Sequence, residues 1–204
     1  MLFVFSKFKG SHWENYSVDK RLKILQALEN KMAKKVHRAP LPIVVHPDPN
    51  WNCFGMFQVQ GNKQVLLINE NLLYKHELRF HALETIIHEG RHAYQYIVIN
   101  SKISPFNFKA KAWKKNYEGY FNSATDSTIY SYQPIERDAQ KFTIKMLKNL
   151  AFKYRNDEDF AYTLRANINR YEQAEVDARK EYGLFYKHKI NKKIEKQKDH
   201  QWWH

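Results

Sequence analysis

The chain has 204 residues, of which 43% are hydrophobic and 15% aromatic. This much apolar surface can offset the entropy lost on folding, so a wholly disordered protein is excluded. With only 6 glycines and 6 prolines, the chain has too few turn-forming residues for a low-complexity protein and fewer than a turn-dense β-sandwich normally uses. The composition therefore favours helix.

The charge is strongly positive, with 34 Lys and Arg against 21 Asp and Glu, a net charge of +13. Such a field attracts nucleic acid, acidic proteins or anionic surfaces without distinguishing among them. Part of the excess is concentrated in residues 187–204. We expect this segment to form a basic tail, a solvated helix or a frayed end, after a domain of residues 1–186.

The single cysteine, Cys53, limits the kind of metal site and the compartment. One cysteine cannot form an intramolecular disulfide or a thiolate cluster, so a metal site must be built from His and carboxylates. The apolar start, residues 1–5, is shorter than a signal-peptide core, and no later stretch reaches the ~18 apolar residues of a membrane span. We expect a cytoplasmic protein with no membrane partner.

The first part of the chain predicts one helix and a small sheet. Apolar residues recur at three- and four-residue spacing over residues 17–36, behind a possible cap at Ser17. A short β-branched run follows at residues 43–46. Two further strands, residues 54–59 and 64–68, flank a Gly-Asn loop and predict an antiparallel pair.

The rest of the chain predicts mainly helices. Helical spacing returns over residues 77–100, and residues 109–132 are poorly patterned, which we interpret as a helix and a loop. Pro134 opens a further helix, because proline suits the first helical turn. Another helix is expected over residues 157–182. The predicted fold class is α+β, with an N-terminal helix, a small antiparallel sheet and C-terminal helices.

The strongest chemical signal is His88-Glu89-Gly90-Arg91-His92, an H-E-x-x-H pattern in the middle of the helix predicted over residues 77–100. On a helix, positions i and i+4 share one face, so His88 and His92 can both bind a single cation. Glu89 lies close enough to reach a water on that metal without being a ligand itself. The alternative is that both imidazoles are structural and Glu89 is an ordinary helix former.

Zinc bound by two histidines needs a third protein ligand and leaves its fourth position to water. The extended pattern that ends in a third histidine is excluded, because Gln95 and Ile99 stand at its Gly and His positions. The third ligand is therefore a carboxylate from a later helix. Two acidic residues fit, Glu136 and Glu175, each within a Glu-x-Asp-Ala sequence. We favour Glu136, because Pro134 fixes the first turn of its helix.

Two segments together resemble a known family. Residues 85–95, TIIHEGRHAYQ, followed by residues 132–142, YQPIERDAQKF, are similar to the gluzincin metallopeptidases, particularly the small intracellular ones of the ImmA/IrrE type. The resemblance covers roughly residues 40–147. It implies a zincin-like fold, zinc (Zn2+) as the cofactor, His88, His92 and Glu136 as zinc ligands, and Glu89 as general base.

The resemblance also implies how a substrate binds. In that family the small sheet offers an edge strand that pairs with an extended peptide, a role that residues Gln64, Val65, Leu66, Leu67, Ile68 and Asn69 would fill here. Larger gluzincins often place an Asp four residues after the ligand Glu to orient a histidine, but this chain has Gln140 there. Asp138 is a weaker candidate for that role.

These residues predict a zinc metallopeptidase that hydrolyses a protein or peptide substrate. The metal would activate a water, Glu89 would transfer its proton to the leaving amine, and a donor would stabilise the oxyanion. Tyr130, Tyr132 and Arg91 are candidates for that donor. The alternative is a nucleic-acid-associated protein that works through its basic surface and has a structural or vestigial metal site.

Overall fold

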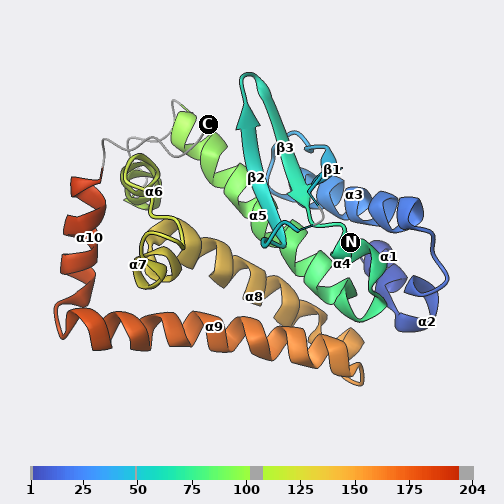
Figure 1. Ribbon diagram of the computed structural model, residues 1–204. Helices are drawn as coiled ribbons and strands as arrows, with labels where there is room; N and C mark the ends of the chain where they lie inside the picture. Colours follow the sequence, from blue (N-terminus) through green and yellow to red (C-terminus); the bar gives the residue numbers. More distant parts are fainter. Residues whose placement is uncertain (1, 49, 102–107, 198–204) are drawn as a thin grey trace.

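The computed structural model describes residues 2–48, 50–101 and 108–197 and has an α+β architecture (Figure 1). Its helices and strands, in chain order, are α1 (Leu2–Phe5), α2 (Gly10–Trp13), α3 (Val18–Lys35), β1 (Ile43–Val45), β2 (Gly55–Gln60), β3 (Lys63–Ile68), α4 (Asn71–Tyr74), α5 (Arg79–Asn100), α6 (Phe108–Glu118), α7 (Ser127–Tyr132), α8 (Pro134–Tyr154), α9 (Glu158–Tyr182) and α10 (Tyr186–Lys196). Short 3-10 helices precede α2 and α5.

The N-terminal helix is confirmed. Ser17 caps α3, and its hydroxyl accepts a hydrogen bond from the Lys20 backbone N–H at 3.3 Å. The expected apolar side of α3, including Leu25, Leu28 and Met32, is buried. These side chains join the main core, which lies between α3, the sheet, α4, α5 and α8.

The sheet is mixed and not antiparallel as expected. Its strand order is β1-β3-β2, with β2 antiparallel and β1 parallel to β3. The run at residues 43–46 supplies the parallel strand, because Ile43 pairs with Leu66 and Val45 with Ile68. The predicted substrate-binding edge, Gln64–Asn69, is therefore wrong: most of it lies in β3, and Leu66–Ile68 are bonded to strands on both sides. The edge strands are β1 and β2.

Helix α5 runs through the middle of the molecule (Figure 1). It contacts α3, β2 and β3 on one side and α8 on the other. This position explains why α5 is apolar on more than one side, with Phe80, Leu83, Ile86 and Ile87 all fully buried. Side chains on α5 are thus held between the sheet and the C-terminal helices.

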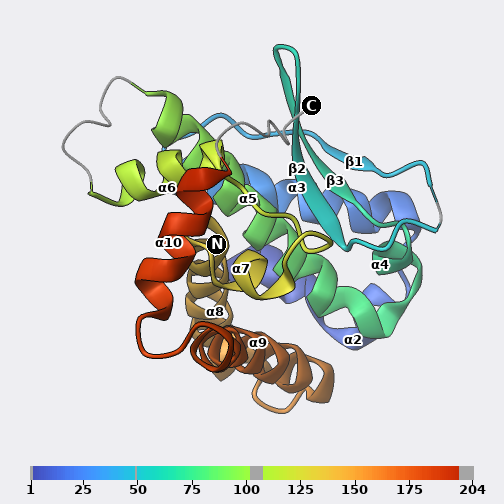
Figure 2. The ribbon, with the colours of Figure 1, turned by 60° about the vertical axis from the view of Figure 1, so that its left-hand side comes forward.

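Helices α8, α9 and α10 form the C-terminal part, in which α9 returns antiparallel to α8 (Figure 1) and α10 lies beside α6 (Figure 2). The C-terminal segment was expected to be a solvated basic tail. Its described residues instead belong to α10, a helix that packs against the rest of the chain. Ile190 and Ile194 are buried against α6, α7 and α9, and the backbone of α10 at Ile194 lies so close to Gly119 that a Cβ there would overlap it. Residues 198–204 lie outside the described part of the chain.

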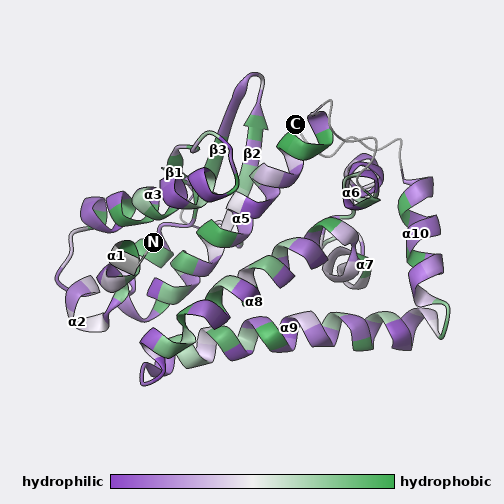
Figure 3. Ribbon diagram, turned by 180° about the vertical axis from the view of Figure 1, so that it is seen from behind, coloured by the Kyte–Doolittle hydropathy of each residue, from purple (hydrophilic) through white to green (hydrophobic). Residues whose placement is uncertain are grey.

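The hydropathy of the helices is mixed. Hydrophobic and hydrophilic residues alternate along α3, α8, α9 and α10 (Figure 3), which is the pattern of helices with one buried side. Among the described residues, no helix combines the length and the apolar character needed to cross a membrane. The expected cytoplasmic location stays a prediction.

Candidate metal centre

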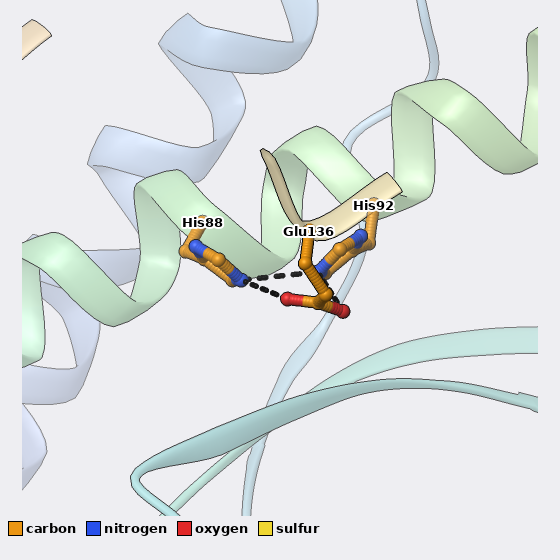
Figure 4. A group of neighbouring side chains, drawn as sticks. All are labelled: His88, His92 and Glu136. Carbon is orange, nitrogen blue, oxygen red and sulfur yellow. Dashed lines mark hydrogen bonds and ion pairs between the residues drawn. The ribbon is translucent and has the colours of Figure 1, made fainter. Parts of the chain in front are cut away.

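The two histidines of the H-E-x-x-H pattern lie one turn apart on α5 and face the same space (Figure 4). Their Nε2 atoms are 3.0 Å apart and their ring planes are inclined by 78°. His92 is buried and His88 is half-buried. The imidazoles therefore present two nitrogen donors to one point at the surface of the helix, as the i, i+4 spacing predicts.

Glu136 completes this group from α8. Its Oε2 lies 3.3 Å from His88 Nε2, and its Oε1 lies 3.4 Å from His92 Nε2. The carboxylate points between the two rings (Figure 4). The ligand atoms of the three residues all lie within 4.8 Å of one another.

The donor set fits a tetrahedral cation. An ion with bonds of about 2.0–2.2 Å keeps its tetrahedral ligand atoms about 3.3–3.6 Å apart. The two imidazole nitrogens are 3.0 Å apart, and each has one oxygen of the Glu136 carboxylate near that distance, Oε2 at 3.3 Å from His88 and Oε1 at 3.4 Å from His92. Two imidazole nitrogens and one carboxylate oxygen are ligands that zinc accepts, and they leave a fourth position open.

The electrostatics of the three side chains show the same preference for positive charge. Burial favours the neutral imidazole of His92, but the adjacent Glu136 carboxylate outweighs it and raises the pKa of His92 to about 9. Burial also acts to raise the pKa of Glu136, yet His92 and His88 together hold that pKa far below its usual range. The charged forms of His92 and Glu136 therefore stabilise each other.

The start of α8 is fixed by a buried amide network, which places Glu136. Pro134 occupies the first turn. The Gln133 side chain cannot cap the helix, since it bonds to the backbone of Phe121, and Asn116 Oδ1 instead accepts from the Ile135 backbone N–H at 2.9 Å. Gln133 and Asn116 are also bonded to each other at 2.8 Å. The first turn of α8 thus has a defined position relative to α6 and α5.

Gln95 orients the second histidine. Its Oε1 lies 2.8 Å from His92 Nδ1, and its Nε2 donates to the Ile135 carbonyl and to Asp138 at 3.0 Å each. A partner on the other ring nitrogen fixes both the tautomer and the orientation of a ligand histidine. Sequence analysis missed this role, although Gln95 stands three residues after His92 on the same helix face. Asp138, which we gave little weight, acts through Gln95.

Glu89 lies between the histidines and the sheet. Its Oε2 accepts a hydrogen bond from the Phe57 backbone N–H at 2.7 Å. The approach of α5 to β2 depends on Gly55, because a Cβ there would come within 2.3 Å of Thr85 Cγ2 and 2.9 Å of the Leu67 carbonyl oxygen. The proposed base is thus held beside the metal ligands and against an edge strand.

Of the two tyrosines predicted as oxyanion donors, the structure places one at the cleft and the other away from it. Tyr130 lines the cleft beside Glu136, and this carboxylate, followed by burial, raises the pKa of Tyr130 well above its usual value, which keeps the phenol protonated. Tyr132 is the wrong choice, because its ring packs against Tyr186 and lies under the Arg137 guanidinium. Tyr120, which no sequence pattern indicated, donates to Glu136 Oε1 at 2.8 Å.

Arg91 and Glu175 are also placed away from the ligand group. The Arg91 guanidinium bonds to Asp138 at 2.7 Å and packs against aromatic rings, Tyr94, Trp113 and Phe142 among them. Glu175, the alternative third ligand, lies on α9 and is bonded to Arg179 and Tyr186. Neither side chain can contribute to the metal centre.

A cleft of about 230 Å³ opens beside the metal ligands. Its lining comes from the segment before β2, from α5, from α7 and α8, and from Arg170 and Tyr171 of α9. Deep in this cleft the buried Glu84 carboxylate contacts His81 and Arg170, each at 3.4 Å. The ligand residues His88 and Glu136 and the Glu89 carboxylate are all reached through this cleft.

Comparison with known proteins identifies no relative, since no family model, no curated protein and no solved structure matches this chain.

Proposed function

We propose that this protein is a zinc metallopeptidase with a zincin-like arrangement, resembling the gluzincins. The observation that carries the proposal is the convergence of His88 Nε2, His92 Nε2 and the Glu136 carboxylate at separations of 3.0 to 3.4 Å. These ligands come from two helices, and Glu136 follows His92 by 44 residues in the chain. Glu89 beside them supplies the base that hydrolysis needs.

The residues around the ligands support the chemistry. A zinc ion held by the three ligands would polarise a carbonyl and lower the pKa of a water. Glu89 lies one residue after His88 and borders the same cleft, so its carboxylate can take a proton from a water there and pass it to the leaving amine. Tyr130, kept protonated by its surroundings, can donate to the developing oxyanion.

The substrate path follows β2 and not β3. The Phe57 N–H donates to Glu89 and not to β3. In the antiparallel ladder, Phe57 therefore belongs to the residue pairs whose backbone groups are not hydrogen-bonded to the opposite strand. The alternation directs the backbone groups of Gly55, Phe57 and Val59 outward, and of these the Phe57 N–H is already bonded to Glu89. An extended peptide that adds to this edge would pass beside Glu89 and the metal ligands.

The test is a paired measurement of metal content and cleavage. We expect about one zinc per chain by elemental analysis and cleavage of a denatured protein such as casein. Glu89→Gln should retain the zinc and lose about 10²- to 10⁴-fold in cleavage rate, the usual contribution of a general base. The matched control is Glu172→Gln, an exposed change of the same chemistry on α9, which should leave both readouts unchanged. Cleavage by Glu89→Gln at the parent rate would contradict the proposed mechanism.

A further inference from the structure

Helix α8 has a second, unused face. Its inner side buries Glu136, Ala139, Thr143 and Leu147. Its outer side carries a row of exposed residues at four- and three-residue spacing, namely Lys141, Lys145, Lys148, Phe152 and Arg155. This spacing keeps the row on one side of the helix, and at about 1.5 Å per residue the row extends for about 21 Å.

The acidic residues nearest this row in the sequence lie at its ends, Asp138 before it and Asp157, Glu158 and Asp159 after it. The sequence contains no Asp or Glu between Asp138 and Asp157. Asp138 is already bonded to Arg91 and Gln95, and Asp157 to Arg79. Within the described chain, the four cations of the row form no ion pair. Like charges four residues apart destabilise a helix, so an anionic partner would stabilise this face.

Another basic helix at the surface, α10, is partly neutralised. On α10, Lys193 lies 3.7 Å from Asp126, and Glu195 pairs with Lys115 of α6. The α8 row differs in a second respect, since a cation of the row lies over its exposed aromatic ring, whereas within the described residues Phe185, the exposed ring at the start of α10, has no such cation. Phe152 is 82% exposed, and the Arg155 guanidinium lies over its ring at 5.4 Å. Phe152 is the one large apolar side chain of α8 that is exposed, which is too little apolar area for insertion into a membrane.

We propose that the outer face of α8 binds single-stranded nucleic acid. A linear row of cations matches a linear polyanion, and an exposed aromatic ring beside an arginine can stack with an unpaired base. Duplex nucleic acid offers the same phosphates but no free base faces, so Phe152 favours the single strand. The row lies on the opposite side of α8 from Glu136, so the bound strand leaves the cleft open. This inference is independent of the proposed peptidase activity.

The experiment uses the full chain and a fluorescently labelled 20-nucleotide oligo-dT, followed by anisotropy between 50 and 200 mM KCl. Four phosphate contacts on a single strand predict a salt slope of about −3, so the fourfold rise in salt weakens binding about 50-fold. The triple variant Lys141→Gln, Lys145→Gln, Lys148→Gln should bind about 100-fold more weakly at 0.1 M salt and reduce the slope to about −1. Circular dichroism checks that each variant is folded.

A matched triple variant removes the same charge elsewhere. Lys189→Gln, Lys192→Gln, Lys196→Gln takes three exposed lysines from α10 and should weaken binding threefold or less. Equal losses in the two triple variants would show that only the net charge matters and would overturn the proposal. Absence of binding by the parent at 50 mM salt would overturn it too.

The Phe152→Ala variant tests the preference for single strands. Loss of one stacked base should weaken oligo-dT binding by about 5- to 150-fold and leave the salt slope unchanged. The same change should not affect binding of a duplex of equal length. Two results together would contradict the assignment to single strands: the parent binds duplex as tightly as oligo-dT, and Phe152→Ala binds oligo-dT like the parent. The site would then contact phosphates alone. Cleavage of casein by these variants should match the parent, which separates this inference from the metal centre.

Discussion

Two regions of the chain share one local sequence and have different surroundings. Glu136-Arg-Asp-Ala139 begins α8, and Glu175-Val-Asp-Ala178 lies within α9. In both, the alanine is fully buried and faces the interior. Yet the Glu136 side chain is 8% exposed and lies between two imidazoles, whereas that of Glu175 is 33% exposed and pairs with arginines.

The two carboxylates have one kind of partner in common. Each accepts from a tyrosine hydroxyl, Tyr120 at 2.8 Å for Glu136 and Tyr186 at 3.1 Å for Glu175. What differs is the helix opposite: α5 presents histidines to Glu136, while Glu175 is bonded to Arg179 of its own helix. The short sequence motif therefore specifies a carboxylate one turn before a buried alanine, and the neighbouring element decides whether it can be a metal ligand.

The largest expected effect separates the two glutamates by metal binding. Glu136→Ala removes one of three ligands. Removing only the hydrogen-bond partner of a ligand already costs about 10- to 100-fold in metal affinity, so the loss of a ligand should lower zinc affinity by more than about 100-fold. Glu175→Ala should keep about one zinc per chain. Elemental analysis after dialysis against a weak chelator measures both. Zinc loss in Glu175→Ala alone would reverse the assignment.

The next effect compares two glutamines. Gln95 contacts His92 and Asp138, whereas Gln173 contacts Asp177 of the second motif at 2.7 Å. Gln95→Leu leaves the His92 ring without its Nδ1 partner, so zinc affinity should fall by about 10- to 100-fold. Gln173→Leu should have no effect on it. Competition with a fluorescent chelator gives both affinities, and equal values for the two variants would refute the role of Gln95.

A smaller effect is expected for the two tyrosine hydroxyls. Tyr120→Phe removes the donor to Glu136 and should weaken zinc binding by about tenfold, the lower end for a partner of a metal ligand. Tyr186→Phe, the matched change at Glu175, should leave zinc binding at the parent value. Isothermal titration with zinc distinguishes them. Unchanged affinity in Tyr120→Phe would show that the hydroxyl does not support the ligand.

The smallest effect concerns pH and Glu175. A hydrogen bond from Tyr186 lowers the pKa of Glu175; burial opposes this shift, and Arg179 and Arg137 add to it. A lowered folded-state pKa contributes stability above the pKa of the unfolded chain, and this stability is lost as the pH falls through the folded value. Glu175→Gln should therefore flatten the acid side of the stability curve slightly below pH ~4.5. Urea unfolding from pH 7 to pH 3 tests this, with Glu172→Gln as the control.

Much of the local structure could be predicted because its causes are local. The Ser17 cap, the Pro134 helix start and the helical spacing around His88 each depend on residues within one or two turns. The position of β1 could not be predicted in this way. Its pairing with β3 joins residues more than twenty positions apart, and nothing in the run at residues 43–46 specifies a parallel neighbour.

The same distinction holds within the candidate site. The pair His88 and His92 follows from the period of one helix, so the sequence alone determined it. The third metal ligand did not follow from the sequence, because two similar motifs each offered a carboxylate. Only the packing of α8 against α5 brought Glu136 to the imidazoles. Likewise Tyr120 and the outer edge of β2 reach the site through contacts between distant segments. A helix fixes its own faces, but which faces meet depends on how the whole chain packs.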